Sequence, residues 1–116
     1  MIAEQMRDLA VAALEDVKGR DLAVLDVRGM TSITDYMIIA SATSSRHLKA
    51  LADSVLDKAQ QHQLRPLGCE GENGGEWALI DLGDVIVHVM TPEIRDFYQL
   101  EKLWGEDAPA LGAGQG

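Results

Sequence analysis

The stretch that decides the fold is Trp77-Ala78-Leu79-Ile80-Asp81-Leu82-Gly83-Asp84-Val85-Ile86-Val87-His88-Val89-Met90. Mostly apolar runs lie on both sides of Gly83-Asp84, which is typical of two strands joined by a two-residue turn with glycine first. In that register Leu82 pairs with Val85. One face of the predicted hairpin then carries only aliphatic side chains, which we expect to face the core: Ala78, Ile80, Leu82, Val85, Val87 and Val89.

The opposite face of the predicted hairpin is chemically mixed. It carries Trp77, Leu79 and Asp81 on the first strand and Ile86, His88 and Met90 on the second. A large aromatic, a methionine and a titratable ring on one face are common in surfaces that bind a partner. An uncovered face and a helix-covered face share the same alternation, so the pattern is compatible with Trp77 either in the core or at the surface.

Asp81, Asp84 and His88 raise the alternative of a metal or acid–base site. In the predicted register Asp84 lies in the turn while Asp81 points out of the sheet, so the two carboxylates are not side by side as a two-metal site requires. No second His or Cys lies at ligand spacing from His88, which favours a hydrogen-bonded sheet histidine. We therefore expect neither a metal site nor a cofactor.

Outward from the hairpin, the periodicity predicts an α/β fold with a mixed β-sheet flanked by helices. The expected elements are a helix at 2–19, strands at 22–27 and 36–40, a helix capped by Thr43 or Ser44 and ending near Gln63, a short edge strand at 66–69, the hairpin, and a helix that begins at Thr91-Pro92. Both early strands are apolar enough to suggest burial on two faces. Residues 1–104 are interpreted as one domain, and 105–116 as a disordered tail.

The composition limits the class of partner. The chain has 116 residues, a formal net charge of −9 and a pI near 4.6. Such an acidic chain is poorly suited to bind nucleic-acid phosphates directly, and a basic protein surface is the more natural partner. The chain has a single cysteine, no apolar run near the ~20 residues that span a bilayer, and no leader before the first helix. These features predict a cytoplasmic protein without membrane association.

Two helices carry further candidate binding residues. The start of the second helix, at 44–47, offers free backbone N–H groups that favour an anion, but it lacks the glycine-rich cradle of nucleotide-binding loops. The last helix places Ile94, Phe97 and Leu100 at helical spacing, while Arg95, Tyr98 and Lys102 line another side. Tyr and Arg are residue types that anchor interfaces.

As a set, several segments closely resemble the RsfS/Iojap family of ribosomal silencing factors. They are DVRG at 26–29, SITDYMII at 32–39, TSSRH at 43–47, GEN at 71–73, Trp77, DLGDVIVHVM at 81–90 and LEKLW at 100–104. The likeness runs in matching order and spacing from the first helix to Trp104. It implies a nucleotidyltransferase-like fold without enzymatic activity, which binds ribosomal protein number fourteen of the large subunit at the intersubunit face, blocks subunit joining and so represses translation.

By position, the resemblance also implies which residues contact that partner. They are Trp77, Glu70, Asp81, His88, Met90, Tyr98 and Lys102. Gly74, Gly75 and the tail after Trp104 match no family pattern.

Two other hypotheses stand beside this one. A nucleotidyltransferase-like enzyme would use Asp81, Asp84 or Asp26 with Mg²⁺ and would bind phosphates at Ser44 and Ser45, although a Gly-Ser helix start and two acids on one strand are not cleanly present. A self-associating protein would pair through exposed Leu79, Ile86 and Met90, and such a homodimer is compatible with silencing.

Overall fold

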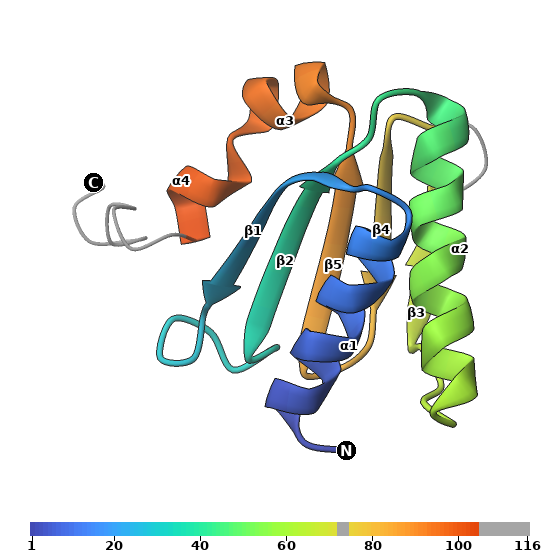
Figure 1. The fold of residues 1–116 in the computed structure, drawn as a ribbon. Helices are drawn as coiled ribbons and strands as arrows, with labels where there is room; N and C mark the ends of the chain where they lie inside the picture. The colour runs from blue at the N-terminus through green and yellow to red at the C-terminus, as the bar shows by residue number, and fades with distance from the viewer. Residues whose placement is uncertain (72–74, 105–116) are drawn as a thin grey trace.

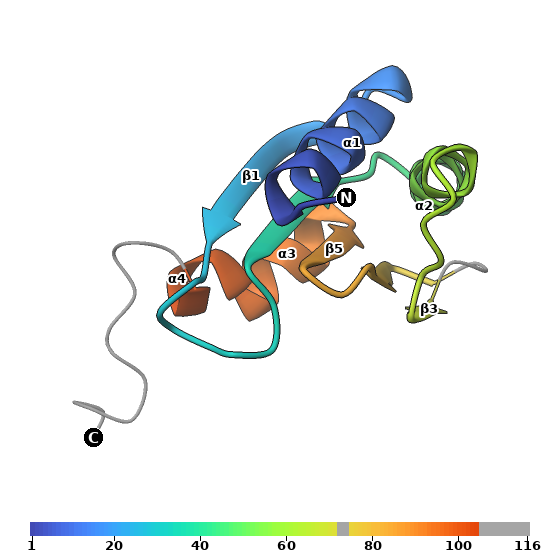
Figure 2. The same cartoon turned by 90° about the horizontal axis from the view of Figure 1, so that it is seen from below.

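The computed structural model describes residues 1–71 and 75–104, and it places helices on both faces of one β-sheet (Figure 1). Helices α1 (Ala3–Asp16) and α2 (Ser45–Gln61) lie on one face, and the short helices α3 (Pro92–Tyr98) and α4 (Leu100–Trp104) lie on the other, as the view from below in Figure 2 shows. The predicted tail at 105–116 and residues 72–74 of the predicted loop lie outside the described residues.

The sheet has five strands in the order β1-β2-β5-β4-β3. The strands are β1 (Arg20–Asp26), β2 (Tyr36–Ser41), β3 (Gly68–Glu70), β4 (Trp77–Asp81) and β5 (Val85–Met90). The central pair, β2 and β5, is parallel, and the other three pairs are antiparallel. The mixed sheet flanked by helices, the order of its elements and the short edge strand before the hairpin are therefore confirmed.

The hairpin has the predicted register. The N–H of Leu82 donates to the carbonyl of Val85 over 2.9 Å, and Trp77 lies opposite Met90. Gly83 supplies the turn with a backbone φ of +94°, which a side chain at that position would disfavour. All six side chains of the aliphatic face are buried beneath α1 and α2, so the predicted core face is confirmed.

Helix α2 begins where the sequence predicts. The Oγ of Ser44 accepts from the N–H of His47 over 3.0 Å, which confirms Ser44 as the N-cap. The ring of His47 is also engaged: Nδ1 accepts from the N–H of Thr43 over 2.9 Å, and Nε2 lies 2.8 Å from the carbonyl of Val17. The candidate anion-binding segment therefore also joins α2 to the end of α1. None of the helices among the described residues is long and apolar enough to cross a membrane.

The expectation that both early strands are buried on two faces is correct for β2 and wrong for β1. All six residues of β2 are buried because it lies between β1 and β5. β1 is an edge strand, and its Val24 side chain is 43% exposed. Val27, the first residue beyond the end of the strand, is fully buried.

The prediction of a single final helix is also wrong. Thr91 caps α3 as expected, but the helix stops at Gln99, whose backbone adopts a left-handed conformation with φ 51° and ψ 49°. The chain then starts α4 in a new direction. This break allows Leu100 as well as Ile94 to pack on the far face of the sheet, against a buried cluster of Val27, Met37, Ile39 and Met90.

Candidate partner-binding surface

The mixed face of the hairpin is only partly covered. Helices α3 and α4 lie across the sheet on the side of β1 and β2 and leave the side of β3 uncovered (Figure 2). Met90 is fully buried in the covered part. Leu79 and Asp81 of β4, and Ile86 at the opposite end of β5 from Met90, are half-buried.

Trp77 stands at the border between the covered and uncovered parts. Its side chain is half-buried, and its Nε1–H donates to Nδ1 of His88 over 3.0 Å. The centroid of the Tyr98 ring lies 4.9 Å from that of Trp77, and Phe97 meets Tyr98 edge-on, also at 4.9 Å. We call Trp77, Tyr98 and Phe97 the aromatic ridge. Tyr98 is 48% exposed and Phe97 is 75% exposed, so the ridge faces solvent along most of its length.

His88 lies beneath this ridge. Only 6% of it is exposed, and burial lowers its pKa from 6.5 to about 4. The ring is therefore neutral near pH 7, and Nδ1 must be unprotonated because it accepts the indole hydrogen bond. The prediction of a hydrogen-bonded sheet histidine is confirmed.

Both aspartates near the hairpin turn support the fold, Asp81 through its side chain and Asp84 through its backbone carbonyl. Asp81 Oδ1 accepts from the N–H of Gly83 over 2.9 Å, which fixes the turn from within. The backbone carbonyl of Asp84 accepts from Asp35 and Tyr36 at 2.9 and 3.0 Å and joins the turn to β2. Among the described residues, no group of three or more His, Cys, Asp or Glu side chains is placed to hold a metal ion.

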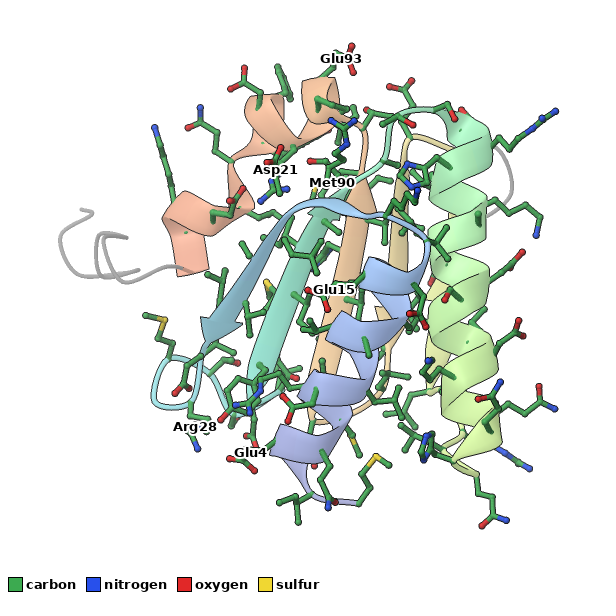
Figure 3. The ribbon with its side chains drawn as sticks, in the orientation of Figure 1. Glu4, Glu15, Asp21, Arg28, Met90 and Glu93 are labelled. Atoms are coloured by element: carbon green, nitrogen blue, oxygen red, sulfur yellow. The ribbon has the colours of Figure 1, made fainter. Side chains whose placement is uncertain are left out.

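The acids and the phosphate-binding residues of the enzyme hypothesis lie far apart. Asp26 is paired with Tyr36 at the start of β2, whereas Ser44 follows the end of that strand. Five residue steps along a strand separate these ends by about 16 Å. In addition, Asp26 is bound to Arg28 at 2.7 Å, and Arg28 reaches Glu4 at 3.3 Å, beside it in Figure 3. This separation disfavours a single active site in which these groups bind and act on one nucleotide.

The seven predicted contact residues fall into two groups. Trp77, Tyr98, Asp81, Glu70 and Lys102 are exposed or half-buried, whereas His88 and Met90 are buried. Lys102 stands apart from the ridge and lines an open cleft of about 440 Å³ with Asp21, Ser41 and Arg95. Phe97 was not among the predicted contacts, because its spacing with Ile94 and Leu100 resembles that of a core position. In the structure Phe97 is a surface residue, 75% exposed, that packs against Tyr98.

These features define the class: a small mixed α/β protein with one sheet face that its own helices leave partly uncovered. The family model described as "Ribosomal silencing factor during starvation" matches residues 2–114. A ribosomal silencing factor RsfS from Chromobacterium violaceum is 45% identical over 114 residues, which are 98% of this chain and 93% of the relative. The chain therefore belongs to the RsfS family of ribosomal silencing factors, as the resemblance predicts.

Two further relatives extend the comparison. A crystal structure of a Chromobacterium violaceum protein matches with a TM-score of 0.89 at 45% identity, covering 98% of this chain and 95% of that one. The mouse protein named mitochondrial assembly of ribosomal large subunit protein 1 is 35% identical over 100 residues, which are 84% of this chain and 44% of the mouse protein.

Proposed function

We propose that this chain represses translation by binding the large ribosomal subunit through ribosomal protein number fourteen at the intersubunit face, where it blocks joining of the small subunit. Membership of the silencing-factor family supports the ribosomal role. The name of the mouse relative, which refers to assembly of the large subunit, favours that subunit as the target. In this account the chain acts in the cytoplasm by steric exclusion and catalyses no reaction.

The observation that carries this proposal is the position of Trp77. It contacts His88 and Tyr98 at the edge of the part of the sheet face that the described helices leave uncovered. Aromatic residues with this partial burial are frequent hot spots of protein interfaces.

Charge supports a basic partner for the same face. Glu70 of β3 is exposed, and Asp81 of β4 is half-buried beside the uncovered Leu79. With a net charge of −9 on the whole chain, long-range attraction would speed the encounter with a basic ribosomal protein. The aromatic ridge would then hold the complex by apolar burial. Salt screens the charge attraction that speeds the encounter, but it has much less effect on apolar burial.

Subunit joining tests the proposal. Purified large subunits are incubated with the chain, small subunits are added, and association is followed by light scattering. We expect association to fall with increasing chain concentration, and the effect to be weaker when the chain is added after joining. Association of unchanged rate and extent at concentrations that saturate the large subunit would contradict the blocking mechanism.

A further inference from the structure

We propose that His88 is a positioning residue, whose Nδ1 fixes the orientation in which Trp77 is presented to the partner. The inference rests on the proposed function for what Trp77 binds. The hydrogen bond between the two side chains is a feature of the free chain. His88 itself does not contact the partner in this account, because only 6% of it is exposed.

The pairing of β4 and β5 places the two rings diagonally. Trp77 lies opposite Met90, and His88 lies opposite Leu79, so Trp77 and His88 share a face one pair apart. Side chains at this diagonal are within reach of each other when one is a large aromatic. The indole spans the diagonal with its N–H 3.0 Å from Nδ1, the ring centroids 5.8 Å apart and the planes tilted by 53°.

Two contacts then hold the indole in place. His88 takes the hydrogen bond at the polar edge of Trp77, and Tyr98 packs against the ring at 4.9 Å. A half-buried indole N–H needs an acceptor, so without Nδ1 the ring would turn to reach water. Because binding must order every mobile side chain of an interface, a ring that is already fixed binds at lower cost.

Two substitutions of His88 separate the hydrogen bond from the packing. In His88→Asn the amide oxygen can take the place of Nδ1 as acceptor. In His88→Leu the acceptor is lost while a buried apolar side chain is kept, so no new buried polar group is created. Thermal unfolding of both variants reports whether the fold is retained.

Nuclear magnetic resonance of the free chain gives a readout that packing alone would not change. In ¹⁵N-labelled protein, a two-bond nitrogen–nitrogen coupling between Nε1 of Trp77 and Nδ1 of His88 detects the hydrogen bond directly. The Trp77 indole resonance is assigned with Trp104→Phe, since the chain has two tryptophans. Wild type should show the coupling, and its absence would overturn the proposal even if neither variant folds.

Binding to purified large subunits completes the test. We expect His88→Leu to bind about 3- to 10-fold more weakly than wild type, the size expected when one side chain must be ordered on binding, and His88→Asn to recover most of the loss. Equal binding by wild type and a folded His88→Leu variant would overturn the positioning role. If wild type itself does not bind, the proposed function fails, while the coupling still decides whether His88 orients Trp77.

Discussion

Arg95 of α3 donates two hydrogen bonds of 2.8 Å to the carboxylate of Glu101 of α4, and its remaining terminal nitrogen donates to Ser41 Oγ over 2.8 Å. One guanidinium thus spans the helix break at Gln99 and ties both short helices to the end of β2. The Arg95 side chain is only 12% exposed, and its hydrogen bonds hold the pKa of Glu101 below its usual range. Since α3 itself has no buried residue, this pair is the main polar support for the position of Tyr98.

Replacing Arg95 should loosen α3 and α4 selectively. Arg95→Met leaves Glu101 and Ser41 without their shared donor, so we expect a loss of about 1–3 kcal/mol in the free energy of unfolding. Hydrogen exchange should quicken at residues 92–103 and stay slow in α2. Arg95→Lys keeps the charge but not the planar guanidinium. We expect its free energy of unfolding to lie between those of wild type and Arg95→Met. Unchanged exchange at 92–103 in Arg95→Met would show that apolar packing alone holds these helices.

The stability of the fold should decrease as the pH falls from about 6.5 to about 4. Burial lowers the pKa of His88 to about 4, so the folded state stays neutral there while the unfolded state takes up a proton near 6.5. The contribution of His88 is complete above pH 6.5 and is lost as the pH falls through this window, by about 3 kcal/mol in total. Urea unfolding at several pH values should show a shallower decline for His88→Leu than for wild type. Parallel curves of stability against pH for wild type and His88→Leu would contradict the assignment of this pH dependence to His88.

The hairpin was predictable because its information is local. Period-two alternation around Gly83-Asp84 determines which side chains share a face, and the order of strands in the sheet does not alter it. The edge position of β1 depends on that strand order, which an apolar run does not encode. No Gly or Pro marks the break at Gln99. The spacing of apolar residues around Gln99 is that of an ordinary helix, so the sequence does not predict its left-handed backbone. Met90 is buried in the cluster against which Ile94 and Leu100 pack, so its burial could not be read from the hairpin alone.

A charge on the aliphatic face of the hairpin should unfold the chain. Val87 is fully buried in the core beneath α1 and α2, so Val87→Asp buries an unpaired carboxylate. We expect loss of the cooperative unfolding transition in circular dichroism. Ile86→Asp, one residue away on the half-buried opposite face, is the matched control and should remain folded. Folded Val87→Asp beside unfolded Ile86→Asp would mean that the two faces are reversed.

Gly71 is required where the end of β3 passes the start of β4. Its backbone has a φ of +83°, and a Cβ there would overlap the carbonyl oxygen of Trp77. Gly71→Ala should therefore destabilise the fold by about 1–3 kcal/mol and displace the strand that carries Trp77. Gly68→Ala is the control, because nothing lies within 4 Å of a Cβ at that position. Chemical unfolding of the two variants compares them, and equal stability would refute the close approach.

The central claim is that Trp77 anchors this chain on the large ribosomal subunit. The most direct test is co-sedimentation with purified subunits through a sucrose gradient, comparing wild type, Trp77→Ala and Ile33→Ala. Ile33 is 77% exposed in the β1–β2 link, at the other end of the sheet from α3 (Figure 1), and serves as the control. We predict that wild type and Ile33→Ala travel with the large subunit, and that folded Trp77→Ala, weakened by about 2 kcal/mol or more, stays at the top. Migration of folded Trp77→Ala with the large subunit at the wild-type level would contradict the account.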